Sequence, residues 1–431
     1  MYNNPMLNIF AKGVYFKKPT TLLNSPIEVM PTPQKVFIPF LQHKGEPAIP
    51  IVKPGDTVRI GMKIGEPANG VSSAIHSSVS GKVLEIKPLP HPFAGRALCC
   101  IIESDSSENW ERNFIDTDYH SLEKEELLKR IKDAGIVGLG GGGFPTDIKI
   151  FEGMKGRVKI LIINCCESEP NLCADYRTII EYPQCVIEGA RIIQKILDAP
   201  EMIFAVSGVY KDIIKVLKKD DIIVKVFPPI FPQGSERLLM KEILKRRLQP
   251  SELPVDYGAI VQNASTCYAV YQAVKYNKPL IERIITVTGD GIQNEKNILA
   301  KIGTPVDEII KFCGGLKKPV KKIIFGGLMT GIAQFSFHVP IIKPINGIVF
   351  QSSIDEEILN ECTRCGFCID VCPMDLLPQI MYRFIKENDI EEAFDYGLNE
   401  CIECGCCAYV CPSNIPLVHY FKSARIKSSN G

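Results

Sequence analysis

The sequence predicts a multidomain chain of the α/β class. Its 431 residues are about three times the length of a typical domain, so several hydrophobic cores are expected. Short β runs with turn residues fill residues 35–104, strands alternate with helices over 158–227, and cysteine-rich runs follow residue 361. Strands that alternate with helices are typical of a mainly parallel sheet covered by helices.

The composition excludes some classes of protein. A formal net charge of +1 argues against a nucleic-acid-binding protein, and 45% hydrophobic with 23% charged residues excludes wholesale disorder. Residues 1–16 lack the features of a signal peptide, and no apolar run is long enough for a transmembrane helix. We therefore expect a cytoplasmic chain whose 17 cysteines act first as ligands, not as disulfides.

The first part of the chain predicts an extended arm over residues 1–36 and a β module over 37–105. Two phrases of this module, VKPGDTVRIGMKIGE and HSSVSGKVLEI, resemble the half-repeats of biotinyl- and lipoyl-type barrel sandwiches. In that family the modified lysine lies between the half-repeats, near Gly70 in this chain. No lysine occurs between Ile64 and Gly81, so a scaffolding role is expected.

The middle of the chain predicts an α/β domain over residues 120–282 and a small α+β module over 283–350. Apolar residues at helical spacing predict a helix over 122–134 that ends at Gly135. Further along, the patterns predict strands over 158–163, 202–206 and 222–227, and helices over 186–197, 210–218 and 305–312.

Two cysteine runs in residues 351–431 have the C-x₂-C-x₂-C-x₃-C-P spacing of bacterial ferredoxins, in which the fourth cysteine ligates the other cluster. A zinc site would need only one or two C-x₂-C knuckles. We therefore expect two [4Fe–4S] clusters and place each fourth cysteine at the start of a helix. Cys406 is expected to be a small packed residue beside them. The first cluster is assigned to Cys362, Cys365, Cys368 and Cys411, and the second to Cys401, Cys404, Cys407 and Cys372.

A glycine-rich loop, Gly138 to Gly143, follows a helix and so departs from the strand–loop–helix order of a dinucleotide fingerprint. Backbone without Cβ atoms still allows close approach of a phosphate or a ring, and Lys149 lies just downstream. A polar loop follows the strand that ends at Asn164, where α/β folds place ligands. By itself, the segment from Asn263 to Thr266 is typical of an ordinary helix cap.

Taken in order, the motifs GLGGGGFPTDIK, LIINCCESEPNLCADYR, FPQGSE and VQNAST are similar to the FMN-binding half of the NADH-oxidising subunit of respiratory complex I. Residues 12–425 as a whole resemble the RnfC family, the C subunits of Rnf ion-translocating electron-transport complexes. PIEVMPTPQKVFIPFLQHKGEPA, ERIITVTGDG and FGGLMTG belong to this wider resemblance.

The resemblance implies a barrel-sandwich module, a Rossmann-like FMN-binding core, a β-grasp (SLBB-like) module over 283–350 and a C-terminal ferredoxin-like α-helical domain. It implies that Glu167, Glu169 and Glu236 line a catalytic pocket shared by FMN and NADH. The FMN ligands that it implies are Gly138, Gly140, Gly141, Gly143, Lys149, Asn164, Gly234, Asn263 and Thr266.

The chain departs from its relatives in the polar loop after Asn164, which we call the acidic turn (residues 165–173). There Cys166 replaces an aspartate or a small residue. Ser168 stands where Rnf subunits often carry cysteine, and Phe231 replaces a tyrosine. The thiols of Cys165, Cys166 and Cys173 are redox-active groups, ligands of a further metal, or small buried residues. These departures weaken the expectation that nicotinamide is the substrate, and they leave the expectation of a flavin site unchanged.

The expected function is that of an NADH-dependent oxidoreductase and translocase subunit. It exchanges hydride with NAD(H) at FMN and passes electrons through both clusters to integral membrane and flavoprotein subunits, with ferredoxin reached through the complex. The expected location is peripheral, on the cytoplasmic face of the membrane. A soluble relative that feeds a reductase such as proline reductase is the first alternative. A non-catalytic iron–sulfur scaffold is the second, and the complete cysteine sets disfavour it.

The segment after Pro412, NIPLVHYFKSARIK, has an amphipathic pattern with basic residues towards its end. Such a segment is expected either to dock on a partner or membrane surface or to form a plain surface helix.

Overall fold

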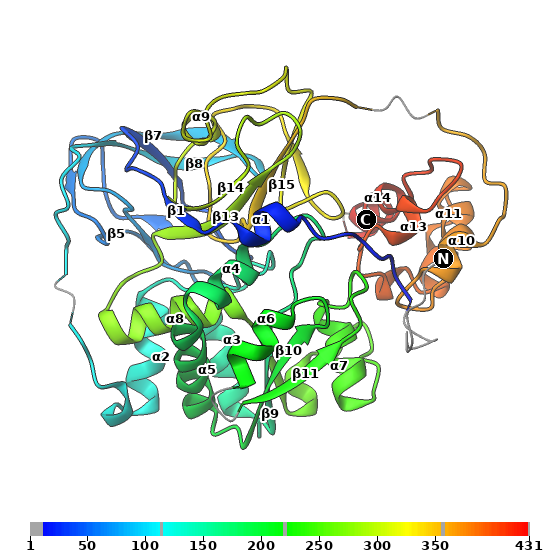
Figure 1. Ribbon diagram of the computed structural model, residues 1–431, viewed down its shortest axis with the longest axis horizontal. Coiled ribbons are helices and arrows are strands. Elements are labelled where there is room, and N and C mark those ends of the chain that lie inside the picture. The colour runs from blue at the N-terminus through cyan, green and yellow to red at the C-terminus, as the bar shows by residue number, and fades with distance from the viewer. Residues whose placement is uncertain (1–11, 113–114, 219–221, 355–357, 430–431) are drawn as a thin grey trace.

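The computed structural model describes residues 12–112, 115–218, 222–354 and 358–429. A helix-covered sheet forms the lower half of the molecule in Figure 1, and two β-rich modules lie above it. A small helical unit with both cysteine runs lies to one side. We refer to these parts as the α/β core, the β module, the mixed-sheet module and the cysteine-rich unit.

The α/β core is built on a parallel four-stranded sheet in the order β11-β10-β9-β12. Strands β9 and β12 are mostly apolar and buried because helices cover both faces of the sheet, whereas the edge strand β11 is partly exposed. The strands are β9 (Ile160–Asn164), β10 (Glu201–Ser207), β11 (Ile223–Phe227) and β12 (Ala259–Asn263). The first three coincide closely with the predicted strands.

Six helices pack on one face of this sheet and α7 lies on the other. The helices are α2 (Lys124–Asp133), α3 (Thr146–Lys155), α4 (Ala174–Glu181), α5 (Pro183–Leu197), α6 (Lys211–Leu217), α7 (Glu236–Leu244) and α8 (Ala264–Tyr276). Helices α5 and α8 approach closely at Gly189, where an added Cβ atom would lie 1.8 Å from the Cys267 carbonyl oxygen. Short 3-10 turns occur at Tyr119–Ser121, Pro254–Tyr257 and Leu398–Glu400.

The β module consists of two small sheets that enclose one apolar core. One sheet has the order β2-β8-β7-β4 and the other β3-β5-β6. The strands are β2 (Lys35–Pro39), β3 (Ile49–Pro50), β4 (Thr57–Val58), β5 (Lys63–Glu66), β6 (Ile75–His76), β7 (Gly81–His91) and β8 (Gly95–Ser104).

The mixed-sheet module is a six-stranded sheet in the order β1-β14-β13-β17-β15-β16, with α9 packed on it. The predicted helix over 305–312 corresponds to α9 (Val306–Phe312). The strands are β1 (Ile27–Val29), β13 (Glu282–Thr288), β14 (Lys296–Lys301), β15 (Lys322–Phe325), β16 (Ile332–Gln334) and β17 (Gly347–Gln351).

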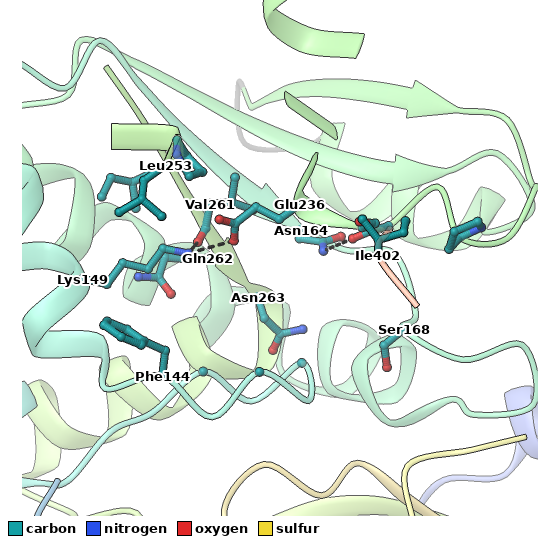
Figure 2. A pocket seen from close by; sticks show the side chains of 18 of the residues that line it. Phe144, Lys149, Asn164, Ser168, Glu236, Leu253, Val261, Gln262, Asn263 and Ile402 are labelled. Carbon is teal, nitrogen blue, oxygen red and sulfur yellow. Dashed lines mark hydrogen bonds and ion pairs between the residues drawn. The ribbon is translucent and has the colours of Figure 1, made fainter. Parts of the chain in front are cut away.

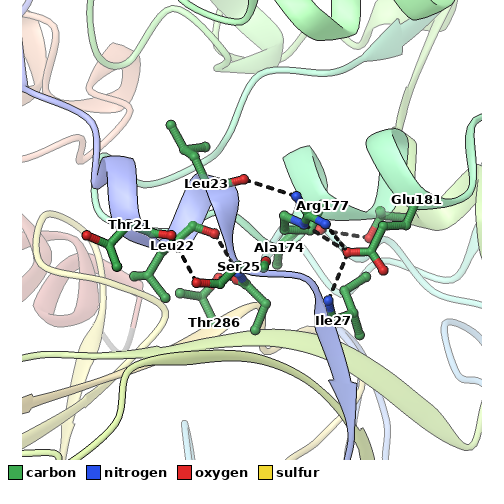
Figure 3. Close-up of polar contacts among 11 residues, drawn as sticks. Thr21, Leu22, Leu23, Ser25, Ile27, Ala174, Arg177, Glu181 and Thr286 are labelled. Atoms are coloured by element: carbon green, nitrogen blue, oxygen red, sulfur yellow. Dashed lines mark hydrogen bonds and ion pairs between the residues drawn. The ribbon is translucent and has the colours of Figure 1, made fainter.

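The prediction of an extended N-terminal arm was wrong for part of its described residues, and residues 1–11 lie outside them. The arm forms α1 (Thr20–Asn24) and β1, which pairs in parallel with β14. Figure 3 shows how it is fastened: Arg177 donates to the Leu23 carbonyl (3.0 Å) and the Ile27 amide donates to Glu181 (2.8 Å). These partners lie far away in sequence, so local periodicity could not reveal them.

The cysteine-rich unit is a small helical bundle around its own apolar core. Its helices are α10 (Phe367–Asp370), α11 (Pro378–Lys386), α12 (Ile390–Asp395), α13 (Cys406–Tyr409) and α14 (Leu417–Ser429). Val418, Phe421 and Ala424 are the buried face of α14, so this apolar face is not free to dock elsewhere. Within the described residues, no helix has both the length and the apolar character needed to cross a bilayer.

Candidate functional site

The main cavity of the molecule has a volume of about 760 Å³ and lies where the carboxyl ends of β9 and β12 meet. This is the edge at which α/β sheets bind ligands, and the volume is in the range of cofactor sites. Asn164 and Asn263, two predicted FMN ligands, are register partners at these strand ends. Both line the cavity, as Figure 2 shows.

The glycine loop forms the floor of the main cavity. It closes through the Gly138 amide, which donates to the Phe144 carbonyl (2.8 Å), and the Gly143 amide, which donates to the Gly138 carbonyl (3.0 Å). Gly138, Gly140 and Gly142 line the cavity, and a Cβ atom added at Gly142 would meet nothing within 4 Å. A flat ring or a phosphate therefore has open space above this backbone, which fits the predicted flavin. Gly141 and Gly143, which were also predicted as FMN ligands, do not line the cavity.

Thr266, another predicted FMN ligand, lies behind the loop and does not line the cavity. Its hydroxyl accepts a hydrogen bond from the Leu139 amide (2.9 Å) and so holds the glycine loop. Asn263 serves two purposes: its Oδ1 caps α8 by accepting from the Thr266 amide (3.2 Å), and its side chain lies against Gly140. The helix-cap interpretation and the cavity interpretation of Asn263 therefore both hold.

Asp175 orients Asn263 and was not singled out from the sequence. The Asn263 Nδ2 donates to Asp175 Oδ2 (2.8 Å), so its amide nitrogen cannot exchange places with its oxygen. Asp175 is 1% exposed, and burial raises the pKa of its carboxyl while hydrogen bonds from Ser265 and Asn263 oppose that rise. Asp175 lies in the first turn of α4, directly after a segment rich in polar residues, and no local pattern set it apart from them.

Lys149 carries the positive charge that the sequence predicted for this cavity. Its Nζ donates to Glu236 (2.9 Å) and to the Val261 carbonyl (2.7 Å), and all three residues line the main cavity. On the opposite side, Asn164 Nδ2 donates to the Gly234 carbonyl (2.8 Å) and Asn164 Oδ1 accepts from the Cys166 amide (3.0 Å). The structure thus brings Glu236 and Gly234, both predicted, to the same cavity.

The two predicted glutamates of the acidic turn have different surroundings. Glu167 lines the main cavity, and its Oε1 accepts from the Tyr176 amide (2.7 Å). Burial and the neighbouring Asp175 raise the pKa of Glu167 to about 8, although Lys18 opposes the rise. The Glu167 carboxyl is therefore able to change its charge near neutral pH.

Glu169 does not line the main cavity. Its carboxylate accepts from the Met329 amide (2.9 Å), the Thr330 amide (2.8 Å) and the Thr330 hydroxyl (2.5 Å). It is 1% exposed, so these contacts account for both of its oxygens. The geometry makes Glu169 an anchor for the loop 326–331 of the mixed-sheet module, which differs from the pocket role that the resemblance implied.

The three thiols of the acidic turn are buried: Cys165, Cys166 and Cys173 are all at most 5% exposed. Burial raises the pKa of Cys166 to about 12 and raises the pKa of the other two thiols as well. Because the thiolate is the reactive form, these cysteines have the surroundings of inert packed residues.

The eight predicted cluster ligands fall into two groups around two small cavities. One cavity is lined by Cys362, Cys365, Cys368 and Cys411, and the other by Cys372, Cys401, Cys404 and Cys407. Cys406 also lines the second cavity, beside the four predicted ligands. Each group takes three cysteines from one run and its fourth from the other, as the ferredoxin pattern predicts.

The backbone of the two runs follows the same course. Arg364 and Glu403 both have φ near +55°, and the glycines two residues later have φ near +85°. Amides also point at sulfur: Leu376 N–H lies 3.4 Å from Cys372 Sγ, and Glu403 N–H lies 3.4 Å from Cys401 Sγ. Such hydrogen bonds tune cluster potentials. The fourth cysteines follow α10 and α13, so the prediction that they start helices was wrong.

In the part of the chain that the structure describes, no three His, Cys, Asp or Glu side chains converge tightly enough to bind one metal ion.

The main cavity and the second cysteine group adjoin each other. Cys404 and Ile402 line the main cavity. Beside them the buried Cys406 donates to the Phe231 carbonyl (3.7 Å), and Met329 O would lie 2.9 Å from a Cβ atom at Gly405. Cys362 and Cys365 of the other group are exposed. The second group is thus the inner one and the first group the outer one.

Comparisons with known families match four parts of the chain. They are the RnfC barrel sandwich hybrid domain over residues 9–107, the Nuo51 FMN-binding domain over 131–272, the SLBB domain over 284–333 and the 4Fe-4S dicluster domain over 361–415. These matches confirm the predicted fold class and support FMN and [4Fe–4S] clusters as the cofactors. The predicted domain boundaries remain predictions.

Several curated relatives are similar over most of the chain. The chain is 38% identical to the C subunit of the proton-translocating ferredoxin:NAD(+) oxidoreductase complex of Clostridium ljungdahlii, covering 90% of this chain and 87% of that protein. It is 33% identical to the Na(+)-translocating counterpart of Acetobacterium woodii, with 88% of each covered. The C subunit of the ion-translocating oxidoreductase complex of Serratia proteamaculans is 36% identical and longer, so 93% of this chain spans 58% of it.

One solved structure shares the fold at low sequence identity. It is an NAD+-reducing [NiFe]-hydrogenase in its H2-reduced state, with a TM-score of 0.51 and 16% identity over 70% of this chain and 62% of that chain.

Proposed function

The chain belongs to the family of C subunits of ion-translocating ferredoxin:NAD(+) oxidoreductase complexes, and from this premise we propose its role in such a complex. It is the oxidoreductase subunit that exchanges hydride with NAD(H) at the main cavity and passes electrons singly through its two clusters. The partners at the far end are membrane subunits of the complex.

The observation that carries the proposal is the shared wall between the main cavity and the inner cysteine group, formed by Cys404 and Ile402. FMN bound in the cavity supplies the conversion between a two-electron hydride and single electrons. Because Cys404, a ligand of the inner cluster, lies in the cavity wall, the distance for electron transfer from the flavin to that cluster is short. Cys407 of the inner group and Cys368 of the outer group interact electrostatically, so the outer cluster is the next step for the electrons.

The residues proposed to hold FMN are the glycine loop, Lys149, Asn164, Gly234 and Asn263. The loop offers backbone without side chains, and Lys149 offers an ammonium group that suits an anionic ligand. Thr266 is proposed to act on the loop and not on the flavin, since its hydroxyl is bonded to Leu139.

The outer cysteine group is the proposed contact point for the next electron carrier. Cys362 and Cys365 are exposed, and Ile358, Leu359 and Phe367 beside them are each more than half exposed. An exposed apolar rim around a cluster suits docking of a protein partner. We place the chain at the cytoplasmic face of the membrane, held there by partner subunits.

The soluble-reductase alternative drew on the thiol-rich acidic turn. Because Cys165, Cys166 and Cys173 are buried with raised pKa values, this feature does not favour a dithiol function. The membrane complex therefore remains the proposed setting.

Anaerobic purification followed by addition of NADH tests the proposal. About eight irons and one FMN per chain are expected, with bleaching of flavin absorbance on mixing. Failure of the reconstituted protein to bind flavin would overturn the proposed redox function. Co-purification with a soluble reductase in place of integral membrane subunits would overturn the proposed setting.

A further inference from the structure

A second, smaller cavity lies behind the acidic turn, on the far side of Glu167 from the glycine loop. Its volume is about 40 Å³, enough to hold water. Lys18, Cys166, Tyr210 and Gln233 line it, and Glu167 lines both this side cavity and the main cavity. The Glu167 carboxyl therefore separates the proposed site of NAD(H) chemistry from a second polar space.

Three polar atoms of the side cavity are buried and have no hydrogen-bond partner among the described residues: Glu167 Oε2, Tyr210 Oη and Gln233 Nε2. Tyr210 is 2% exposed and Glu167 is 7% exposed. Buried polar groups without a protein partner are usually satisfied by ordered water. One or two water molecules in this space would join the carboxyl, the phenol and the amide.

Lys18 lies on the N-terminal arm and lines the side cavity. Its Nζ is 5.3 Å from the centre of the Tyr210 ring, and the side chain is half-buried. The arm is fixed here by paired backbone hydrogen bonds of 2.9 Å between Val14 and Phe231. The polar side chains thus lead from the main cavity towards solvent: Glu167 lines the main cavity, Tyr210 is buried in the side cavity, and Lys18 is half-buried.

The proposed function requires that protons move between the main cavity and solvent through a chain of polar groups. Oxidation of NADH gives NAD+, two electrons and one proton. The clusters carry the electrons and cannot carry the proton, so the proton has to leave the main cavity by another way. In the reverse direction, one proton has to enter for each NAD+ that is reduced.

We propose that Glu167, water in the side cavity, Tyr210 and Lys18 form the proton path between the main cavity and solvent. The inference rests on the proposed function and deepens it. During NADH oxidation the Glu167 carboxylate takes up the proton and passes it through water and the Tyr210 hydroxyl to Lys18. Lys18 gives it to solvent, and each group returns to its starting protonation state. Reduction of NAD+ uses the same steps in reverse.

The charges around Glu167 suit a proton carrier. Burial and Asp175 raise its pKa to about 8, while Lys18 and the Tyr176 amide lower it. Arg283 also faces it, and Cys166, Cys173 and Tyr210 are the other titratable groups around the carboxyl. Burial lowers the pKa of Lys18, and the neighbouring Glu167 raises it. A pKa near the working pH is the property that proton transfer needs.

Tyr210→Phe tests the path because it removes the unpartnered hydroxyl that faces the side cavity and leaves the ring in place. Protein loaded with FMN and both clusters is mixed with NADH in weak buffer that contains a pH-indicator dye. Proton release is expected to slow at least about tenfold, with unchanged flavin and iron content and unchanged NADH affinity. Lys17→Met, at the exposed neighbour of Lys18, is the matched control and should release protons at the wild-type rate.

Lys18→Met adds a readout that does not depend on turnover. Removing the Lys18 charge leaves the Glu167 carboxyl with less stabilisation of its ionised form, so its pKa should rise above that of the wild type. An infrared titration of the oxidised protein without NADH follows the carboxyl C=O band of Glu167, which Glu167→Gln identifies by removing it. The band should persist to higher pH in Lys18→Met and not in Lys17→Met.

Wild-type rates of proton release in both Tyr210→Phe and Lys18→Met would overturn the path. So would an unshifted carboxyl band in Lys18→Met. These outcomes differ from failure of the proposed function, which would show as absence of flavin bleaching by NADH in the wild-type protein. In that case the infrared titration still tests the link between Lys18 and Glu167.

Discussion

Replacing Glu169 by Gln tests whether this carboxylate anchors the loop 326–331 or lines the pocket shared by FMN and NADH, as the resemblance implied. In the structure Oε1 accepts from the Thr330 amide and hydroxyl, and Oε2 accepts from the Met329 amide. Glutamine has one acceptor oxygen. If that oxygen keeps both bonds to Thr330, the NH2 group faces the Met329 N–H and the third bond is lost.

The expected cost follows from that geometry. One hydrogen bond to a charged group contributes about 1.5–3 kcal/mol, which corresponds to about 10- to 150-fold more frequent opening of the loop. Hydrogen–deuterium exchange of a peptide that spans 326–331 measures this opening directly. Glu125→Gln, at an exposed glutamate of α2, is the control and should leave the exchange unchanged.

The loop also contacts the redox site, so a second measurement belongs with the first. Thr330 lines the main cavity, and Met329 lies against Gly405 next to the inner cysteine group. We expect Glu169→Gln to slow cluster reduction in rapid-mixing experiments while flavin reduction by NADH keeps its rate and KM. Unchanged exchange together with a raised KM for NADH would refute the anchoring role and favour direct contact with the substrate.

Three further outcomes are expected. Cys411→Ala should abolish the signal of the outer cluster in electron paramagnetic resonance spectra and leave that of the inner cluster. Cys406→Ser should keep both signals. Loss of the inner cluster in Cys411→Ala would contradict the crossed ligation. Lys149→Met should weaken FMN binding to the flavin-free protein about tenfold or more, by fluorescence titration, because the ammonium in the cavity is lost; equal affinity would exclude Lys149 as a ligand. Because the pKa of Glu167 is about 8, its carboxyl is neutral below that pH and anionic above it, so FMN affinity should fall as pH rises through about 8. Glu167→Gln should remove that fall, and a parallel pH profile in the variant would show that another group is responsible.

Much of the fold follows from local patterns. The predicted strands and helices of the α/β core match β9, β10, β11, α2 and α5, because apolar periodicity reports directly on buried faces. The cysteine spacing likewise predicted the two groups that the structure brings together, since the ligand loops are short and self-contained.

What the sequence left open depends on contacts between distant segments. Glu169 bonds to Thr330, and Lys18 lies beside Tyr210 and Glu167. Nothing in the local sequence of the arm or of the acidic turn indicates these partners. Asn263 illustrates the same point. The local sequence predicted its role as a helix cap, but its hydrogen bond to Asp175 is formed only in the tertiary fold.

The position of Cys404 has a consequence for the assembly of the protein. Cys404 and Ile402 form part of the main cavity wall. Because cluster binding is coupled to the folding of its cysteine loop, we expect this part of the wall to form fully only once the inner cluster is in place. Iron is therefore expected to be inserted before flavin during maturation. Cells short of iron should accumulate a colourless chain that lacks both cofactors, so the nucleotide content of this protein depends on the supply of iron.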